Sequence, residues 1–262
     1  MDFDSVADIL LALALTTPRI IGAFLMLPLL TQQTVPATVR NSFFVSLAIV
    51  VLPIAVAAAP AQEVGVGGLA VLLVKEIFIG IAIGFCFGMV FWAMGAAGNV
   101  IDTKVGATLA QIFDPIQGHQ TSLTGDFLSQ FAAWLFMASG GFLVFLDILM
   151  SSYALWPVTS FIPDIRPQGI HTFVGHFSYF ATAFLVIAAP ALVLMALVDL
   201  SLGLVNRYAP QLNVFALTLP IKAWISTWII LLMLGVLVEF VLDRIGVERG
   251  LLDLLDRTFG SR

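Results

Sequence analysis

Long apolar stretches, separated by short polar ones, run through the whole chain. A membrane-spanning helix needs about 20 consecutive, mostly apolar residues. Six segments meet that condition, at residues 9–30, 42–59, 69–98, 127–149, 177–200 and 214–238. Prolines or polar residues interrupt several of them, and proline and glycine mark some of the connections. The pattern predicts an all-α, polytopic membrane protein of about six hydrophobic helices, with broken helices and hairpins among them.

The composition supports the membrane interpretation and excludes nucleic acid as a ligand. Of the 262 residues, 60% are hydrophobic and 10% are charged, whereas about 25% of the residues of a soluble domain are charged. The formal net charge is −5, without any run of lysine or arginine that could bind phosphates. The first residues include Asp2, Asp4 and Asp8, unlike the basic start of a secretory signal. We therefore expect the chain to stay in the membrane uncleaved, in contact with lipid.

Several charged residues lie in or at the ends of the apolar segments. They are Arg19, Lys75, Glu76, Asp147 and Lys222. A charge at the centre of a bilayer costs about 2.5 to 3.5 kcal/mol on insertion scales, so such side chains are expected to face protein or water. They could line a conduit or an assembly seam, or they could extend to the membrane surface, which fits Lys222 and Asp147 well. Both interpretations stay open for Lys75 and Glu76, which as helical neighbours need not pair with each other.

The third segment carries three glycines at four-residue spacing, Gly80, Gly84 and Gly88. This spacing places them along one face of a helix, where another helix backbone can approach closely. The motif indicates packing and no chemistry, and we assign it to assembly.

The sequence contains no combination of residues typical of an enzyme or a cofactor site. The three histidines, His119, His171 and His176, have no carboxylate or cysteine at the spacing of metal ligands. Phosphate-binding glycine loops and nucleophile motifs are also absent. We predict that the protein is not an enzyme and that it uses no cofactor and no metal.

The stretch from residue 190 to 222 is the most distinctive part of the chain. It contains Pro190, Asp199, Gly203, Arg207, the run Pro210-Gln211-Leu212-Asn213-Val214-Phe215, Pro220 and Lys222. This stretch resembles the FliR/SctT family, the R or T subunit of the type III secretion export apparatus. The resemblance extends in order over nearly the whole chain, through Arg19 and Pro28, then Lys75-Glu76 with Gly80 and Gly84, then Asp102, Gly106 and Asp114-Pro115. Val105 departs from the polar or basic residue expected before that glycine.

The resemblance implies a function that composition cannot show. Members of this family sit in the bacterial inner membrane, where one copy joins P/R-type and Q/S-type subunits in a hetero-oligomeric, helical gate. A U/B-type switch protein associates with the gate, and unfolded substrates pass through it. This chain would then be a single integral membrane domain, of the virulence type, with a P/R-like half at about 1–150 and a Q/S-like helical hairpin at about 170–245. An amphipathic tail at 239–262 would follow, and the apolar segments need not all cross the bilayer.

Two parts of the chain are candidates for specific roles in such a gate. Between Gly106 and Pro115, the resemblance implies an apolar plug, and hydrophobic constrictions can block ions by excluding water. The plug residues would be Leu109, Ile112 and Phe113, although a re-entrant loop that only packs fits the pattern equally well. The second part is an assembly motif at the break between the last two segments, where Asn213 can cap the following helix. Its residues would be Asp199, Arg207, Pro210, Gln211, Asn213 and Phe215.

Two other functions are compatible with a chain of this kind. Broken helices and intramembrane charges also suit a secondary transporter of a small solute. Such a transporter would be expected to show an inverted repeat and a central ion site, and the sequence shows neither. The other alternative is a purely structural membrane scaffold.

Overall fold

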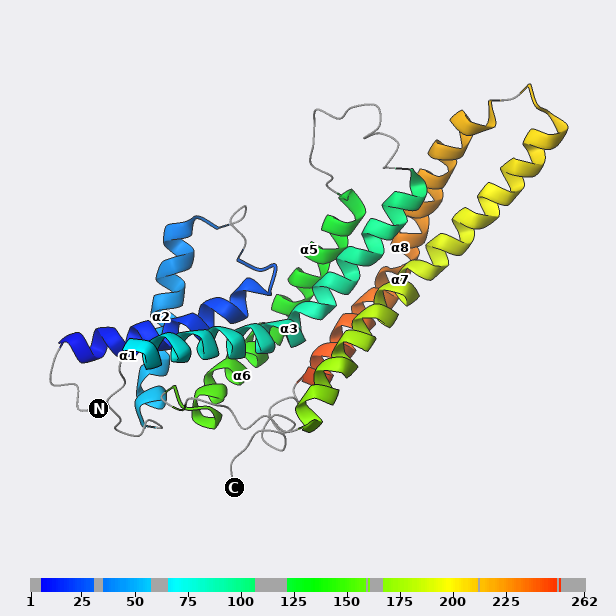
Figure 1. The fold of residues 1–262 in the computed structure, drawn as a ribbon. Helices are drawn as coiled ribbons and strands as arrows, with labels where there is room; N and C mark the ends of the chain where they lie inside the picture. Colours follow the sequence, from blue (N-terminus) through cyan, green and yellow to red (C-terminus); the bar gives the residue numbers. More distant parts are fainter. Residues whose placement is uncertain are drawn as a thin grey trace. The chain divides into compact units, whose positions relative to one another are not determined.

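The structure, a computed structural model, describes residues 6–30, 35–57, 66–106, 122–158, 160, 167–211, 213–248 and 250. Throughout these ranges the regular secondary structure is helical. The helices are α1 (Val6–Leu25), α2 (Ala37–Ala57), α3 (Val66–Val105), α5 (Leu123–Ala138), α6 (Gly141–Leu155), α7 (Pro167–Tyr208) and α8 (Val214–Glu248) (Figure 1). The prediction of an all-α protein is confirmed.

Four of these helices, α2, α3, α7 and α8, are long and apolar enough to cross a membrane. The adjacent helices α5 and α6 would make a fifth span if the bent pair is counted as one. The apolar part of α1, Ile9–Leu25, is shorter. The chain is therefore a polytopic membrane protein, with four or five candidate spans among the described residues instead of the six apolar segments of the sequence.

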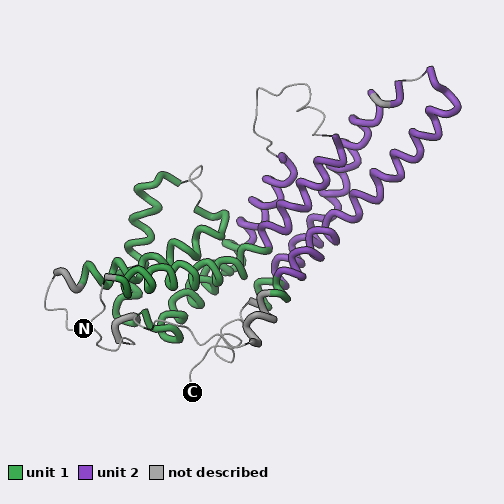
Figure 2. The backbone as a smooth tube through the Cα atoms, viewed as in Figure 1, with its two compact units in different colours: residues 1–89, 136–176, 244–262 green, residues 90–135, 177–243 purple. Residues whose placement is uncertain are grey.

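The chain forms two compact units (Figure 2). The first consists of residues 1–89, 136–176 and 244–262, and the second of residues 90–135 and 177–243. Because α3, α5, α7 and α8 each contribute residues to both units, the division does not follow the order of the sequence.

A cluster of aromatic rings forms the centre of the first unit. The Phe24 ring of α1 lies 5.3 Å from that of Phe44 on α2 and 5.2 Å from that of Phe145 on α6, between ring centroids. Phe87 of α3 completes the cluster, with its centroid 5.3 Å from that of Phe145. All four side chains are buried. The Phe24–Phe145 and Phe87–Phe145 pairs are edge-to-face and the Phe24–Phe44 pair is tilted. Aromatic pairs contribute about 0.5 to 1.5 kcal/mol beyond the area that they bury, so the cluster holds α1, α2, α3 and α6 together.

Glycines allow α1 and α3 to pack with their backbones in contact. A Cβ atom added at Gly80 would collide with the carbonyl oxygen of Arg19, and one at Gly84 with that of Ala23. On the opposite helix, a Cβ atom at Gly22 would lie 2.7 Å from the carbonyl oxygen of Ile77. The glycine face of α3 thus has α1 of the same chain as its neighbour at Gly80 and Gly84. Gly88 is also buried, and an assembly role for the three glycines stays a prediction.

The second unit is built on the α7–α8 hairpin and the parts of α3 and α5 that belong to it. The rings of Tyr179 on α7 and Phe240 on α8 stack with their centroids 5.9 Å apart, and at the other end of the hairpin Asp199 pairs with Lys222. α3 and α5 approach at Gly98, where an added Cβ atom would collide with the backbone of Gly125. The prediction of a helical hairpin at about 170–245 agrees with α7 and α8, whereas its likeness to a Q/S-type subunit stays a prediction.

The apolar segment at residues 127–149 is a broken helix. The segment consists of α5 and α6, which are separated at Ser139 and Gly140. Gly140 has φ of 80°, a left-handed conformation that side chains other than glycine seldom adopt, so the helix ends there. Because the flanking residues are hydrophobic on both sides, the sequence pattern does not show this break. Conversely, residues 239–248 of the predicted amphipathic tail continue α8 without interruption, and residues 251–262 lie outside the described part.

We expect the substitution Gly84→Leu to destabilise the first unit, because the added side chain must displace the backbone of α1. Overpacking of this kind costs about 1 to 3 kcal/mol when side chains can adjust, and a rigid helix backbone adjusts less. Thermal unfolding of the purified chain in detergent would measure the loss. Gly67→Leu is the control on the same helix, because nothing lies within 4 Å of a Cβ atom there. Equal melting temperatures for the two variants would contradict the close packing of α1 and α3.

Candidate functional site

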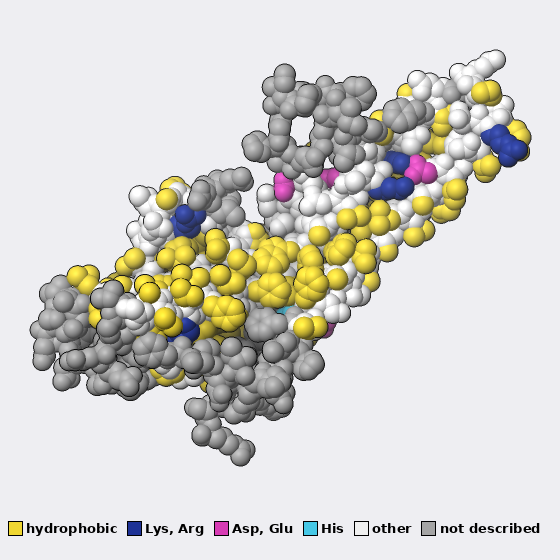
Figure 3. All heavy atoms as spheres, in the orientation of Figure 1, with side chains coloured by type: hydrophobic (Ala, Val, Ile, Leu, Met, Phe, Trp, Pro, Cys, Tyr) yellow, Lys and Arg dark blue, Asp and Glu magenta, His cyan; other side chains and the backbone are white. Residues whose placement is uncertain are grey.

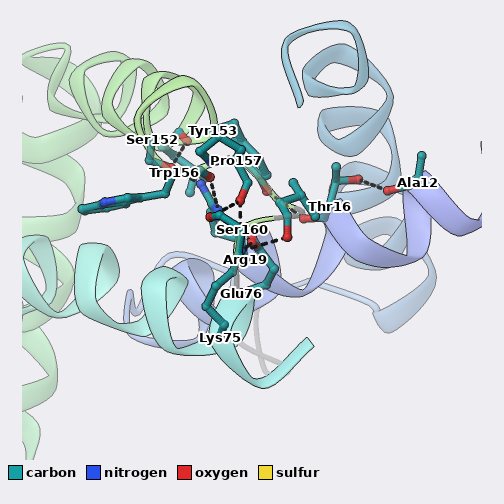
Figure 4. A network of polar contacts seen from close by, with 12 residues as sticks. Ala12, Thr16, Arg19, Lys75, Glu76, Ser152, Tyr153, Trp156, Pro157 and Ser160 are labelled. Carbon is teal, nitrogen blue, oxygen red and sulfur yellow. Dashed lines mark hydrogen bonds and ion pairs between the residues drawn. The ribbon is translucent and has the colours of Figure 1, made fainter. Parts of the chain in front are cut away.

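Arg19 of α1 lies at the centre of a buried polar network in the first unit (Figure 4). Its Nε and Nη2 atoms donate to the two carboxylate oxygens of Glu76 on α3, at 2.6 and 2.9 Å. Nη2 also donates to the carbonyl oxygen of Trp156 at 2.8 Å, and Nη1 to Oγ of Ser152 at 3.0 Å. The guanidinium carbon lies 4.1 Å from the centre of the Tyr153 ring. A bidentate pair with further hydrogen bonds is the arrangement that can hold an arginine away from water.

Lys75 joins the network from the turn of α3 that carries Glu76. Its Nζ atom lies 2.8 Å from Oε1 of Glu76. It also donates to the carbonyl oxygens of Pro157, Val158 and Ser160, at 3.0, 2.9 and 2.9 Å. Lys75 and Glu76 therefore pair with each other, and their side chains point inward against the segment that follows α6.

The network contains more positive than negative charge. Arg19 and Lys75 share the single carboxylate of Glu76, and all three side chains are buried. The excess positive charge faces backbone carbonyl groups just beyond Leu155, the last residue of α6. The last carbonyl groups of a helix lack partners within the helix, and its C-terminus carries a partial negative charge. The carbonyl groups of residues 156–160, together with the partial charge at the C-terminus of α6, thus stabilise the excess charge.

A second ion cluster lies within the second unit and joins three helices. The Asp199 carboxylate of α7 accepts Lys222 of α8 at 2.5 Å and Lys104 of α3 at 3.0 Å. Lys222 is buried. The ammonium group of Lys222 turns to Asp199, and its position near the membrane surface stays a prediction. Asp147, for which the same was expected, is exposed on α6.

Asp102 connects α3 to the start of α5. Its Oδ2 atom accepts hydrogen bonds from Oγ of Ser122 at 2.6 Å and from the backbone N–H of Thr124 at 2.9 Å. Oγ of Ser122 accepts the N–H of Gly125 at 2.8 Å. Ser122 is therefore the N-cap of α5, and Asp102 adds a negative charge where the helix dipole favours one. These bonds hold the start of α5 against the end of α3.

The turn between α7 and α8 carries most of the predicted assembly motif. Arg207, Pro210 and Gln211 are exposed there. The predicted cap at Asn213 is confirmed, because its Oδ1 atom accepts the backbone N–H of Ala216 at 3.3 Å. Phe215 lies in the first turn of α8, and its side chain is outside the described part. The predicted plug residues Leu109, Ile112 and Phe113 also lie outside the described residues.

Sequence reasoning found the charged residues but missed most of their partners. The Arg19 and Lys75 networks depend on Ser152, Tyr153 and four backbone carbonyl groups, and Lys104 was not expected to pair with Asp199. Ser152 and Tyr153 are polar residues at the end of an apolar helix, which is a weak indication. The backbone carbonyl groups give no indication in the sequence, because every residue has a carbonyl group. In the part of the chain that the structure describes, no group of three or more His, Cys, Asp or Glu residues could hold a metal ion.

Comparison with known proteins gives matches over most of the chain. The family described as Bacterial export proteins, family 1, matches residues 10–246. The Yop proteins translocation protein T of Yersinia pestis is 39% identical over 224 residues, which cover 85% of each chain. The surface presentation of antigens protein SpaR of Salmonella typhimurium is 34% identical over 220 residues, 84% of this chain and 81% of SpaR. The flagellar biosynthetic protein FliR of Bacillus subtilis is 30% identical over 244 residues, 92% of each chain.

We expect Glu76→Gln to destabilise the chain strongly. The substitution keeps the shape of the side chain but leaves Arg19 and Lys75 without a counter-charge, and removing one partner of a buried ion pair costs about 3 to 5 kcal/mol. Thermal unfolding in detergent at constant pH would measure the change. Asp147→Asn is the matched control, because it removes an exposed carboxylate from the same unit. A loss no greater than that of the control would show that the Glu76 carboxylate is dispensable.

Proposed function

Because the chain belongs to the Bacterial export proteins, family 1, the FliR/SctT family of type III export apparatus proteins, we propose that it is a core subunit of a type III secretion export gate in the bacterial inner membrane. The observation that carries the proposal is the match over residues 10–246, which includes both ion clusters and the α7–α8 hairpin. The names of the relatives refer to translocation of Yop proteins, to a secretion system apparatus and to flagellar biosynthesis. Identity is 39% to the Yop translocation protein and 30% to FliR of Bacillus subtilis, which favours a virulence-type system.

The geometry of the Arg19 network favours a gate subunit over a small-solute transporter. A transporter needs charged groups that a coupling ion can reach and leave. The guanidinium of Arg19 is fully buried and is held by Glu76, Ser152 and Trp156, so it acts as a rigid structural element. The network therefore holds helices in place for a neighbouring protein or a conduit. That unfolded polypeptides pass through this conduit is likewise proposed.

The surface of the chain supports association with other subunits. Only 17% of the apolar window of α2 and 17% of that of α8 is buried within the chain. Lipid can cover apolar side chains, but a guanidinium such as that of Arg207, exposed in the last turn of α7, needs water or an acidic partner. The proposed partners are P/R-type and Q/S-type gate subunits and a U/B-type switch protein. Unfolded substrates would pass through the assembled gate.

The proposed plug comprises Leu109, Ile112 and Phe113 of the segment 107–121. The described residues on either side support the proposal in one respect. Asp102 holds Ser122 and Thr124 close to the end of α3, so the described residues before and after the segment lie together. Apolar side chains presented to a narrow lumen from this position would exclude water and ions at rest.

We predict that Arg207→Ala weakens assembly with the gate subunits and reduces secretion, because it removes an exposed positive charge from the hairpin turn. Co-expression with the candidate subunits and native gel electrophoresis would measure assembly, and Arg40→Ala on α2 is the control. Normal assembly and secretion in Arg207→Ala would show that the turn has no docking role. Failure of the unaltered chain to assemble with these subunits would overturn the proposed function itself.

We predict that the double substitution Ile112→Ser and Phe113→Ser makes the assembled complex leak ions while secretion continues, because the small polar residues would let water enter the constriction. Ion conductance, or growth under salt stress, would be measured in cells that contain the complex. Leu123→Ser is the control, since it replaces an exposed apolar side chain at the start of α5. An unchanged leak in an intact complex would show that the segment packs and does not seal.

A further inference from the structure

A polar cleft lies within the second unit between the end of α3, α7 and α8. Its volume is about 590 Å³, and its lining includes Lys104, Asp199, Gly203, Asn206, Asn213 and Lys222. This is the size of a small-ligand pocket, for which about 300 to 1,000 Å³ is usual. The cleft is separate from the Arg19 network, which belongs to the first unit.

The charges that line the cleft do not balance. Lys104 and Lys222 share the single carboxylate of Asp199, which leaves one excess positive charge. The side chain of Lys222 is 10% exposed, whereas those of Lys104 and Asp199 are 42% and 35% exposed. In the first unit the corresponding excess is surrounded by carbonyl groups, but here the one backbone acceptor among the described residues is the carbonyl oxygen of Lys104, 3.5 Å from Nζ of Lys222. Two ammonium groups that share one carboxylate at an accessible cleft attract an anion, so the cleft is suited to a monoanion.

Gly203 leaves room for such a ligand. It lies inside α7, where glycine costs about 1 kcal/mol relative to alanine. At Gly80 and Gly98 the close approach of another helix explains the glycine, but nothing lies within 4 Å of a Cβ atom added at Gly203. The residue faces open space and lines the cleft. A side chain there would occupy part of the volume next to the two lysines.

An apolar surface borders the cleft. Leu200 and Leu204 of α7, on either side of Gly203 in sequence, are 67% and 59% exposed. Figure 3 shows basic and acidic side chains grouped beside a broad hydrophobic surface on this unit. The cleft also lies in the part of two candidate spans next to the α7–α8 turn, since Asp199 lies nine residues before the end of α7 at Tyr208 and Lys222 eight residues after the start of α8 at Val214. A charged group next to an apolar surface near the end of a span is the setting in which basic pockets bind lipid headgroups.

We propose that this cleft binds the phosphodiester group of a membrane phospholipid. The single negative charge of the phosphodiester neutralises the excess charge of the Lys104–Asp199–Lys222 cluster. The two ammonium groups and the amide N–H groups of Asn206 and Asn213 are the donors available to its oxygens. The acyl chains lie on the apolar surface of α7 next to Leu200 and Leu204. This site is independent of the proposed role in secretion, since it depends on residues of one chain.

The test uses the full chain, purified in detergent and stripped of lipid, with native mass spectrometry to count bound lipids. The probes are phosphatidylglycerol, a neutral glycosyl diacylglycerol without phosphate, and inorganic phosphate. We expect one phosphatidylglycerol per chain, and little binding of the glycolipid. Gly203→Leu should weaken this binding at least tenfold, because its side chain occupies the part of the cleft next to the two lysines, and Lys104→Gln should weaken it about fivefold, the effect of about 1 kcal/mol per basic residue near a lipid surface. Gly235→Leu is the matched control, because it is also a helix glycine facing open space but does not line the cleft.

Three outcomes would overturn the proposal. The first is equal phosphatidylglycerol binding by the unaltered chain and Gly203→Leu. The second is binding of inorganic phosphate without retained lipid, which would assign the cleft to a free anion. The third is a loss of assembly with gate subunits in Gly203→Leu without any change in lipid binding, which would assign the cleft to an acidic side chain of a partner. Thermal unfolding of each variant without lipid establishes that it is folded.

Discussion

A charged side chain that is buried away from water needs an opposite charge or hydrogen-bond partners within the molecule. This requirement determines how the helices of the first unit are arranged. Three distant parts of the chain meet here: Arg19, Glu76 and the carbonyl groups beyond α6. Without the other two, each of them would lack a hydrogen-bond or ion-pair partner. The Arg19–Glu76 pair fixes the lateral position of α1 against α3, and the glycines at Gly80 and Gly84 fix their distance. Lys75 then ties the segment after α6 to the same point. The aromatic cluster adds apolar contacts among α1, α3 and α6 and connects α2 to them.

The two units show two ways of accommodating an excess positive charge. In the first, the surplus of Arg19 and Lys75 over Glu76 faces carbonyl groups at the C-terminal end of α6, so the protein itself supplies the compensation. In the second, the surplus of Lys104 and Lys222 over Asp199 meets far fewer acceptors and borders an open cleft. The first arrangement is closed and has the character of a structural joint. The second is accessible to an anionic group of a lipid or of a neighbouring protein.

The sequence was sufficient for the fold class, because an apolar run of about 20 residues is typical of a membrane-spanning helix and of little else. It was also sufficient for the cap at Asn213 and for singling out Arg19 and Glu76, since charges are conspicuous in apolar segments, whereas Asp199 was singled out by the family resemblance. It did not reveal the break at Gly140, because the flanking residues are as apolar as those of a continuous helix. Nor could it reveal that Lys222 turns inward to Asp199, or that Lys75 is held by backbone carbonyl groups. These contacts depend on which helices become neighbours in space, and no local pattern records that.

The Arg19 network also has a consequence for the order in which the protein can be made. During synthesis α1 emerges first and α3 follows, but the carbonyl groups that complete the network belong to residues 156–160. Until the ribosome has passed that point, the two cations share one carboxylate without the acceptors that surround them in the finished unit. Arg19, Lys75 and Glu76 are all translated earlier, so the ion pairs of Glu76 are available before the carbonyl groups that surround them. Completion of the first unit therefore waits for well over half of the chain to be translated.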